Sequence, residues 1–407
     1  MTEPGSDLSS VLVAAAIAGR SPTEILEAIS RAMVEAGIPL LRTTVGALLL
    51  HPLLDATLVI WRPDRGAYLD DTPRPAVRGT EAWRDSPFHR LEQAEGRMRR
   101  YRLAEDEGTG EFPVLAQLVA EGASDYLVLR TRLAPGLALG DGTSVFSSWA
   151  CDRPGGFTDA EIARISAIEP LLAVVVAGAL GNATAATLLA TYLGSDAARR
   201  VLGGDVERGR AEMIHAVIWY SDLAGFTRIA DQIAGAGMLQ LFAGAAEILR
   251  LLNDHAEILV DAIEGRGGQV LKFMGDGILA IFRGPGESAA CEAALEAWAE
   301  ASARCGRLGR RPIGQTHPYL ALHAGDVLYG NIGGRARLDF TVLGPAVNEA
   351  SRIAAMCRQL DRTLVMSEEF AGLCPSERRE QLLALGSFTL RGVARPQMLY
   401  GLAEPAG

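Results

Sequence analysis

The sequence predicts a mixed α/β (α+β) fold built from more than one domain, and three observations support this prediction. The chain has 407 residues, which is enough for about two to three domains of ordinary size. Short apolar runs bounded by turn residues, typical of strands, alternate with longer segments of helical periodicity. Apolar residues make up 49% and charged residues 22% of the chain, so each domain can bury an ordinary core.

The N-terminal part is predicted to begin with a loose tail over residues 1–19. Ser21-Pro22-Thr23-Glu24 then places a capping residue and a first-turn proline before helical periodicity, so a helix should begin there. Further along we expect a basic amphipathic helix at Phe88–Leu103 and a long helix after Thr158, with strands at Val45–Leu50, Ala56–Trp61, Tyr126–Arg130 and Ser144–Ala150.

The stretch Gly156–Ala173, G-F-T-D-A-E-I-A-R-I-S-A-I-E-P-L-L-A, resembles the closing helix of a GAF-type sensor domain. Together with the helix and strands before it, it makes residues 20–169 similar to a GAF-like α/β module. This resemblance implies a pocket for a small regulatory ligand. A packing and dimerisation domain that binds nothing is an equal alternative.

From Pro170 to Ser195 the chain has no charged residue. Such a segment is long enough to cross a membrane, but four polar residues dilute its second half and no aromatic belt flanks it. We therefore favour a buried dimer helix, with membrane association through residues 170–195 as the alternative. Residues 170–211 are then a connecting and dimerisation helix followed by a charged linker.

A strand that ends in an aspartate opens the C-terminal part. Ile214–Asp222 reads as a buried strand with a carboxylate at its end, and a glycine turn and a helix follow. Amides at the start of a helix suit an anion, while an aspartate beside them can hold the cation that neutralises it. A simple helix cap is the alternative. The functional interpretation predicts Asp222 as a metal ligand and a phosphate-binding backbone over Leu223, Ala224, Gly225, Phe226 and Thr227.

A hairpin follows at Gly265–Phe282, where two apolar runs flank Gly275-Asp276-Gly277. Asp-Gly is a favoured tight turn, and this alone would explain the motif. If the turn lies beside Asp222, however, Asp276 completes a two-metal site of the kind that drives in-line phosphoryl displacement.

A third motif begins at Gly325-Asp326 and continues to Phe340–Arg352. Pro345 suits the first turn of a helix that carries Asn348 and Arg352 on one face. An amide and a guanidinium pointing the same way suit a sugar oxygen and a phosphate. A solvated helix face is the alternative for these two residues taken alone.

Together these motifs resemble the catalytic domain of the class III nucleotidyl cyclases, the adenylate and guanylate cyclases, over residues 212–403. The resemblance implies a ferredoxin-like domain at 212–407. It also implies that Asp222 and Asp276 bind two Mg²⁺ or Mn²⁺ ions and that Lys272 and Thr341 select the base. Asn348 orients the ribose, Arg352 stabilises the transition state, and Arg391, where many relatives have lysine, contacts phosphate. The Gly-Gly-Asp/Glu-Glu-Phe loop of diguanylate cyclases is missing.

The resemblance implies an adenylate cyclase that converts ATP to cyclic AMP and pyrophosphate, works as a homodimer with two composite sites, and is regulated by its N-terminal domain. Guanylate cyclase activity and a catalytically silent nucleotide-binding scaffold are the alternatives. Lys272 can donate to adenine N1, and the Thr341 hydroxyl can accept from the exocyclic amine. Guanine reverses that pattern, so ATP is the expected substrate.

Composition argues against other classes of protein. Lys and Arg number 39 against 49 Asp and Glu, a formal charge of −10, whereas nucleic-acid binding needs basic surface. The five cysteines include no C-x-x-C pair, so we expect reduced thiols and neither a disulfide framework nor a zinc cluster. Met1–Ser10 is polar and acidic, which makes a secretory signal unexpected and a cytoplasmic location the prediction.

Overall fold

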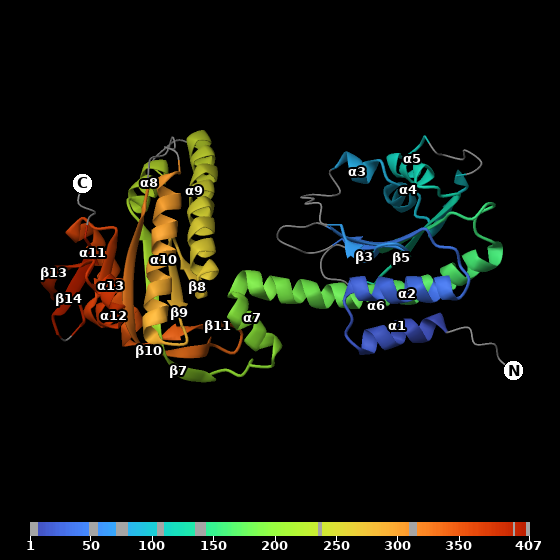
Figure 1. Cartoon of the computed structure of the whole chain (residues 1–407). Coiled ribbons are helices and arrows are strands. Elements are labelled where there is room, and N and C mark those ends of the chain that lie inside the picture. Colours follow the sequence, from blue (N-terminus) through green and yellow to red (C-terminus); the bar gives the residue numbers. More distant parts are fainter. Residues whose placement is uncertain are drawn as a thin grey trace. The chain divides into compact units, whose positions relative to one another are not determined.

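The structure is a computed structural model and describes residues 7–48, 56–70, 80–103, 110–134, 144–234, 238–308, 316–393 and 395–403. The chain forms two compact units, Met1–Leu188 and Leu189–Gly407. Each unit combines a sheet with helices (Figure 1). The predicted α/β fold class is confirmed.

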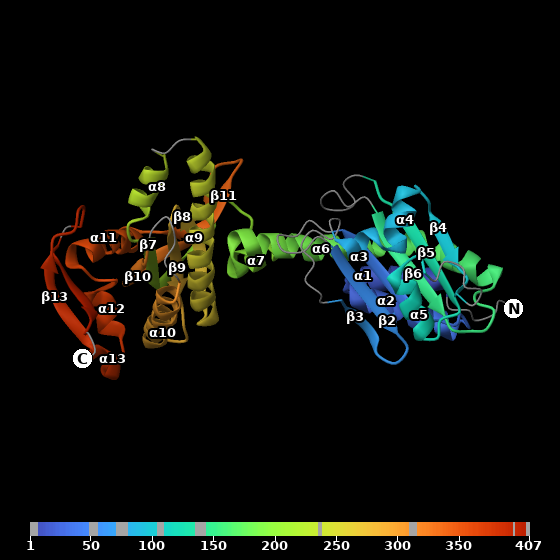
Figure 2. The same cartoon turned by 90° about the horizontal axis from the view of Figure 1, so that it is seen from above.

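The N-terminal unit is built on an antiparallel sheet in the order β3-β2-β1-β6-β5-β4, whose strands lie side by side when seen from above (Figure 2). Four of its strands match the four predicted ones, and residues 49 and 50 of the first prediction lie outside the described residues. The strands are β1 (Arg42–Leu48), β2 (Ala56–Arg62), β3 (Gly66–Leu69), β4 (Met98–Tyr101), β5 (Asp125–Arg132) and β6 (Ser144–Cys151).

Helices cover both faces of this sheet (Figure 1). Helices α1 (Leu8–Ile17), α2 (Pro22–Glu35) and α6 (Asp159–Leu193) bury a core on one face around Trp149 and Leu172. Helices α3 (Glu81–Arg84), α4 (Pro87–Gln93) and α5 (Pro113–Ala120) lie on the other. The predicted start of α2 is confirmed as a capping box, in which the Ser21 amide donates to Glu24 at 2.8 Å and the Glu24 amide to Ser21 at 3.3 Å.

Two sequence predictions for this unit need correction. Part of the predicted tail is the helix α1, because Leu8, Leu12 and Ala15 are buried in the core; residues 1–6 lie outside the described residues. The basic helix expected at Phe88–Leu103 ends as α4 at Gln93. Glu95 takes a φ of 50°, and the chain then enters β4, which pairs with β5. Pairing with a neighbouring strand has overridden helical periodicity here.

Helix α6 includes both the predicted closing helix and most of the charge-free segment. Among the described residues it is the one helix long and apolar enough to cross a membrane, with a mean hydropathy of 1.8 over its most apolar window. A core helix passes the same test, and Ile165, Leu172 and Val176 are buried in the N-terminal core. Helix α7 (Ser195–Leu202) follows after Gly194.

The C-terminal unit contains the predicted ferredoxin-like arrangement. Apart from a short helix after the first strand, its elements follow one another along the chain in this order: strand β7 (Ala211–Leu223), helix α9 (Met238–Gly265), strands β8 (Gly268–Met274) and β9 (Gly277–Phe282), helix α10 (Glu287–Gly306) and strand β10 (Pro318–Gly333). Their strands stand side by side in the order β10-β7-β9-β8. This is the βαββαβ pattern, with every one of these pairs antiparallel.

Further elements extend this sheet. Strands β12 (Leu364–Ser367), β14 (Gln397–Leu402) and β13 (Leu382–Phe388) continue it beyond β10, and β11 (Leu338–Leu343) pairs with the end of β10. Helices α9, α10 and α12 (Glu368–Leu373) share a core on one face. Helix α11 (Pro345–Leu360) covers the other face. The remaining helices are α8 (Phe226–Ala234) and α13 (Ser376–Arg379).

Candidate active site

Asp222 and Asp276 meet at one edge of the C-terminal sheet. Asp222 lies near the end of β7 and Asp276 in the turn between β8 and β9, and β7 pairs with β9. The Leu223 amide lies 3.0 Å from Asp222 Oδ1 and 3.4 Å from Asp276 Oδ2. A Cβ on Gly277 would lie 2.4 Å from the Ser221 carbonyl oxygen, so only glycine lets the turn come this close to β7.

The charge of one of the two carboxylates depends on its surroundings. Burial and, next to it, the neighbouring Asp222 together raise the pKa of Asp276 to about 6. A divalent cation would remove this penalty, and carboxylate oxygens are suitable ligands for Mg²⁺ or Mn²⁺. The described residues contain no group of three or more His, Cys, Asp or Glu side chains that could hold a metal. Two carboxylates therefore suit a cation that takes its other ligands from water and phosphate.

The turn after β7 supplies backbone donors. Gly225 takes a φ of 76°, and α8 begins at Phe226. The amides of Phe226 and Thr227 have no intrahelical acceptor because they open the helix. The Ala224 amide instead donates to the His317 carbonyl at 2.9 Å, and the Leu223 amide faces the carboxylates. Of the five amides predicted to bind phosphate, those of Gly225, Phe226 and Thr227 are therefore the ones without a recorded acceptor in the described part of the chain.

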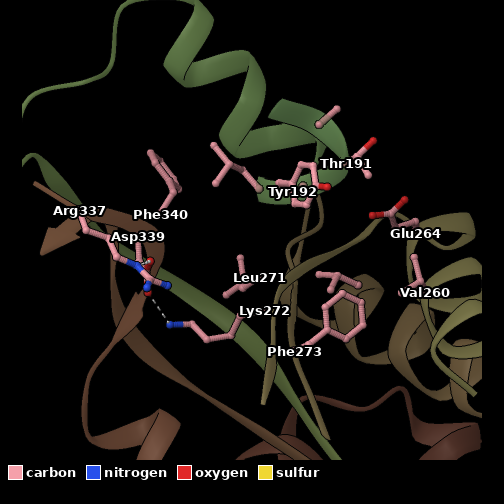
Figure 3. A pocket seen from close by; sticks show the side chains of 14 residues that line it. Thr191, Tyr192, Val260, Glu264, Leu271, Lys272, Phe273, Arg337, Asp339 and Phe340 are labelled. Carbon is pink, nitrogen blue, oxygen red and sulfur yellow. Dashed lines mark hydrogen bonds and ion pairs between the residues drawn. The ribbon is translucent and has the colours of Figure 1, made fainter. Parts of the chain in front are cut away.

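Lys272 lies in a cavity of about 390 Å³ between β8, β11, α9 and the end of α6 (Figure 3). Its ammonium is 3.5 Å from Asp339 Oδ2, and Arg337 also lines the cavity. The register of β8 shifts between Val270 and Lys272, which places Lys272 opposite Leu279. Leu279 in turn pairs with Tyr220, so Lys272 and Asp222 share one face of the sheet.

Thr341 is carried by the strand that Lys272 approaches. It is 4% exposed, and its hydroxyl has no hydrogen-bond partner among the described residues. Asp339 precedes it by two residues in β11 and so lies on the same side of that strand. The structure therefore brings the predicted Lys272 and Thr341 onto two strands, β8 and β11, that lie close together without pairing. A buried hydroxyl without a partner is unfavourable and fits a site that is completed by a ligand.

The end of α6 and the start of α7 form a further wall of this region. Thr191, Tyr192 and Leu193 line the cavity, and Figure 3 shows Thr191 and Tyr192 beside each other at the end of the helix. In α7, Asp196 accepts a hydrogen bond of 2.8 Å from the Tyr329 hydroxyl. The Tyr329 ring contacts Phe340 edge-on at 4.8 Å. Helix α7 is thereby tied to β11.

Asn348 and Arg352 lie on the exposed side of α11, and Arg391 is exposed in the turn after β13. Burial raises the pKa of Tyr220. The negative charges of Asp222 and Asp276 raise this pKa further, and the positive charge of Arg352 lowers it. The charges of Arg352 and of the two aspartates therefore all act on the same hydroxyl within one chain. Leu390, beside Arg391, is buried against Ile353 of α11. In the described part of the chain, no recorded contact joins Asn348 or Arg391 to the aspartates.

Sequence reasoning missed Asp339 and Tyr220, and it gave Arg337 of the third motif no role. Tyr220 lies two residues before Asp222, and Asp339 two residues before Thr341. Residues two apart in a strand share a face, so this spacing could have indicated both. No signal in the sequence could have revealed the contact between Lys272 and Asp339, because it depends on how β8 and β11 are placed.

Part of the sequence is similar to the sequence of a known cyclase. No protein-family model matches the chain. It is 29% identical over 185 residues to an uncharacterized protein of Mycobacterium tuberculosis, covering 46% of this chain and 31% of that protein. It is 30% identical over 173 residues to an adenylate cyclase of Anabaena cylindrica, and the match covers 40% of this chain and 32% of that protein. The chain thus spans about a third of the length of these curated relatives.

Solved structures with a similar chain are also cyclases. A bacterial light-regulated adenylyl cyclase is 22% identical with a TM-score of 0.45, over 59% of this chain and 64% of that one. The guanylyl cyclase Cya2 is 24% identical with a TM-score of 0.38, over 48% of this chain and 96% of that one. Both likenesses are weak and concern the fold alone.

Proposed function

We propose that this protein is an adenylate cyclase that converts ATP to 3′,5′-cyclic AMP and pyrophosphate. The observation that carries the proposal is the pairing of Asp222 with Asp276 around the Leu223 amide, beside the amides that open α8. Similarity to the adenylate cyclase of Anabaena cylindrica supports it. Such a site can hold both the cations and the triphosphate of a nucleotide.

Two Mg²⁺ or Mn²⁺ ions held by Asp222 and Asp276 would, when bound, lower the pKa of the ribose 3′-hydroxyl and neutralise the triphosphate. The amides of Gly225, Phe226 and Thr227 donate to phosphate oxygens. Asn348 orients the ribose, so that the 3′-oxygen attacks the α-phosphorus in line with the leaving pyrophosphate. Arg352 and Arg391 offset the negative charge that develops on the phosphate oxygens.

The base is selected by Lys272 and Thr341. The Lys272 ammonium donates to adenine N1, and the Thr341 hydroxyl accepts from the exocyclic amine. The buried, unpartnered hydroxyl of Thr341 supports this role. Lys272 turns from Asp339 to the base at small cost because both side chains are partly exposed, 34% and 50%.

We further propose a homodimer in which each active site takes Asp222 and Asp276 from one chain and Lys272, Thr341, Asn348 and Arg352 from the other. Residues 20–169 act as a GAF-like regulatory domain for a small-molecule ligand, residues 170–211 connect and dimerise, and residues 212–407 catalyse. The protein works in the cytoplasm. The sheet with helices on both faces in the N-terminal unit is compatible with the regulatory domain.

The proposal is tested with purified full-length protein incubated with ATP or GTP and Mg²⁺ or Mn²⁺, followed by chromatography of the products. The proposal is supported if the wild type forms cyclic AMP from ATP and the double variant Asp222→Asn and Asp276→Asn does not. Cyclic GMP as the main product would show a guanylate cyclase. Nucleotide binding without product would show a silent scaffold.

A further inference from the structure

A buried histidine lies beneath the helix that carries Asn348 and Arg352. His323 belongs to β10 and is 3% exposed. Its Nδ1 is 2.8 Å from the Ser367 hydroxyl and 3.6 Å from Glu369 Oε2, while its Nε2 is 3.6 Å from Glu349 Oε2. One imidazole therefore connects the central strand to α11 and to the start of α12.

The hydrogen bonds of Ser367 indicate which ring nitrogen carries the proton. The Ser367 hydroxyl oxygen caps α12 by accepting from the Phe370 amide at 3.1 Å. Its proton needs an acceptor in this fully buried place, and Nδ1 of His323 lies at hydrogen-bond distance. With Nδ1 accepting, Nε2 carries the proton of the neutral ring on the side that faces Glu349, whose Oε2 at 3.6 Å lies just beyond hydrogen-bond distance.

The position of Glu349 matters because the start of α11 has few other anchors. Gly344 precedes the helix with no side-chain cap, and its first turn has no acidic residue. The helix contacts β10 there through small side chains, since a Cβ on Gly325 would lie 2.8 Å from Ala346 Cβ. The next polar link of α11 to the sheet in the described residues joins the Cys357 thiol to the Leu320 carbonyl at 3.4 Å.

Apolar packing, through Ala346 and Ala350 and further along through Ile353, holds α11 against the sheet, and a polar contact adds a defined direction. Glu349 follows Asn348 directly and lies three residues before Arg352, so it belongs to the turn that presents both. Its side chain is 24% exposed, and it points inward while Asn348 and Arg352 point outward. Whatever holds Glu349 also holds those two side chains.

We propose that His323 is a positioning residue, which is oriented by Ser367 and holds Glu349 so that α11 presents Asn348 and Arg352 in one fixed direction. This inference rests on the proposed function for its catalytic consequence, but the anchoring of α11 does not depend on it. The charges facing the imidazole fit the role. Burial lowers the pKa of His323, Glu369 raises it and His215 lowers it, so the ring is neutral and acts as an oriented donor.

The experiment compares Glu349→Ala, Glu349→Gln and Glu369→Ala in the full-length protein by amide hydrogen exchange and by steady-state kinetics. Glu369 is the matched control, because it lies at the same distance from the same histidine but on α12. We expect exchange over residues 345–354 to speed up about threefold or more in Glu349→Ala alone. We expect kcat to fall about tenfold in that variant, with KM changed less than about twofold.

Glu349→Gln keeps an acceptor for the Nε2 proton and should restore both readouts to within about twofold of the wild type. His323→Asn, which keeps a donor in the core, should resemble Glu349→Ala. Unchanged exchange over 345–354 in Glu349→Ala would overturn the proposal. Equal effects of Glu349→Ala and Glu369→Ala would also overturn it, because the cluster would then only stabilise the fold. If the wild type makes no cyclic nucleotide, the proposed function fails, and hydrogen exchange still decides whether α11 is anchored in this way.

Discussion

The Lys272 ammonium lies 3.5 Å from the Asp339 carboxylate, across the cavity between β8 and β11 (Figure 3). Both side chains remain partly in water, so the pair contributes at most about 1 kcal/mol to stability. Its main consequence is one of direction, because it draws the Lys272 side chain toward the strand that carries Thr341. In the proposed enzyme this prepares the amine to meet the edge of a base.

The first prediction concerns substrate choice. Lys272 and Thr341 match the edge of adenine, and guanine reverses the donor–acceptor pattern. A buried polar mismatch costs ~1–3 kcal/mol, roughly tenfold to a hundredfold in selectivity. We expect kcat/KM for ATP to exceed that for GTP by this factor in the wild type, and Lys272→Glu to shift the preference toward GTP.

Asp339→Asn is the control for that assay. It removes a partly exposed ion pair and should change ATP selectivity less than about threefold. Equal efficiency of the wild type with ATP and GTP would show that the assignment of Lys272 and Thr341 is wrong.

The second prediction concerns metal removal. The folded-state pKa of Asp276 is raised from 3.8 to about 6, so the metal-free protein is stabilised by this group below the usual carboxyl pKa and loses that stability as pH rises toward about 6. At pH 7.5 in EDTA we expect Asp276→Asn to melt about 2–4 °C above the wild type, and Mg²⁺ to raise the melting temperature of the wild type only.

Scanning calorimetry at pH 4 and pH 7.5 provides the check. The difference between variant and wild type should become small at pH 4, where the carboxyl is protonated in the folded state and partly protonated in the unfolded state. A variant less stable than the metal-free wild type at pH 7.5 would contradict the predicted repulsion between the two aspartates.

The third prediction concerns Glu169 of α6. It is 3% exposed, one oxygen bonds to Thr131, and the other has no partner among the described residues. Burial raises its pKa, so the folded state holds its proton more tightly than the unfolded state does. Stability therefore falls as pH rises from the unfolded-state pKa through the folded-state pKa.

Glu169→Gln removes the ionisable group and keeps the shape. Near pH 8 we expect the variant to melt about 2–4 °C above the wild type, as measured by calorimetry. At pH 4 we expect the variant and the wild type to melt at the same temperature. A constant difference at both pH values would mean that packing rather than ionisation distinguishes the variant.

How much of this molecule the sequence predicts depends on the range of each interaction. Features that depend on neighbouring residues were predicted correctly, since the structure contains both the Ser21–Glu24 helix cap and the β8–β9 hairpin. The proximity of Asp222 and Asp276 could be predicted because each lies at the end of a recognisable strand. The strand β4 was missed because its pairing with β5 lies outside the local pattern. The link from His323 to Glu349 was missed because it depends on how α11 packs over β10.

The fourth prediction concerns α6, whose composition fits either a core helix or a membrane span. Since Leu172, Val176 and Leu180 are buried in the N-terminal core, we expect the protein expressed without detergent to stay in the supernatant after ultracentrifugation. Recovery in a pellet that resists high salt and alkaline washing would favour the membrane instead.

The last prediction tests whether two chains share each active site. Arg352 lies close enough to Tyr220 in its own chain to influence its ionisation, so a site within a single chain is the rival arrangement. Under sharing, Asp276→Asn and Arg352→Ala should each be nearly inactive alone, yet form mixed dimers in which one site carries both defects and the other neither. Random pairing makes about half of all dimers mixed, so co-expression should restore roughly a quarter of wild-type activity. Mixed dimers demonstrated by differently tagged chains, but without recovered activity, would mean that each chain carries its own complete site.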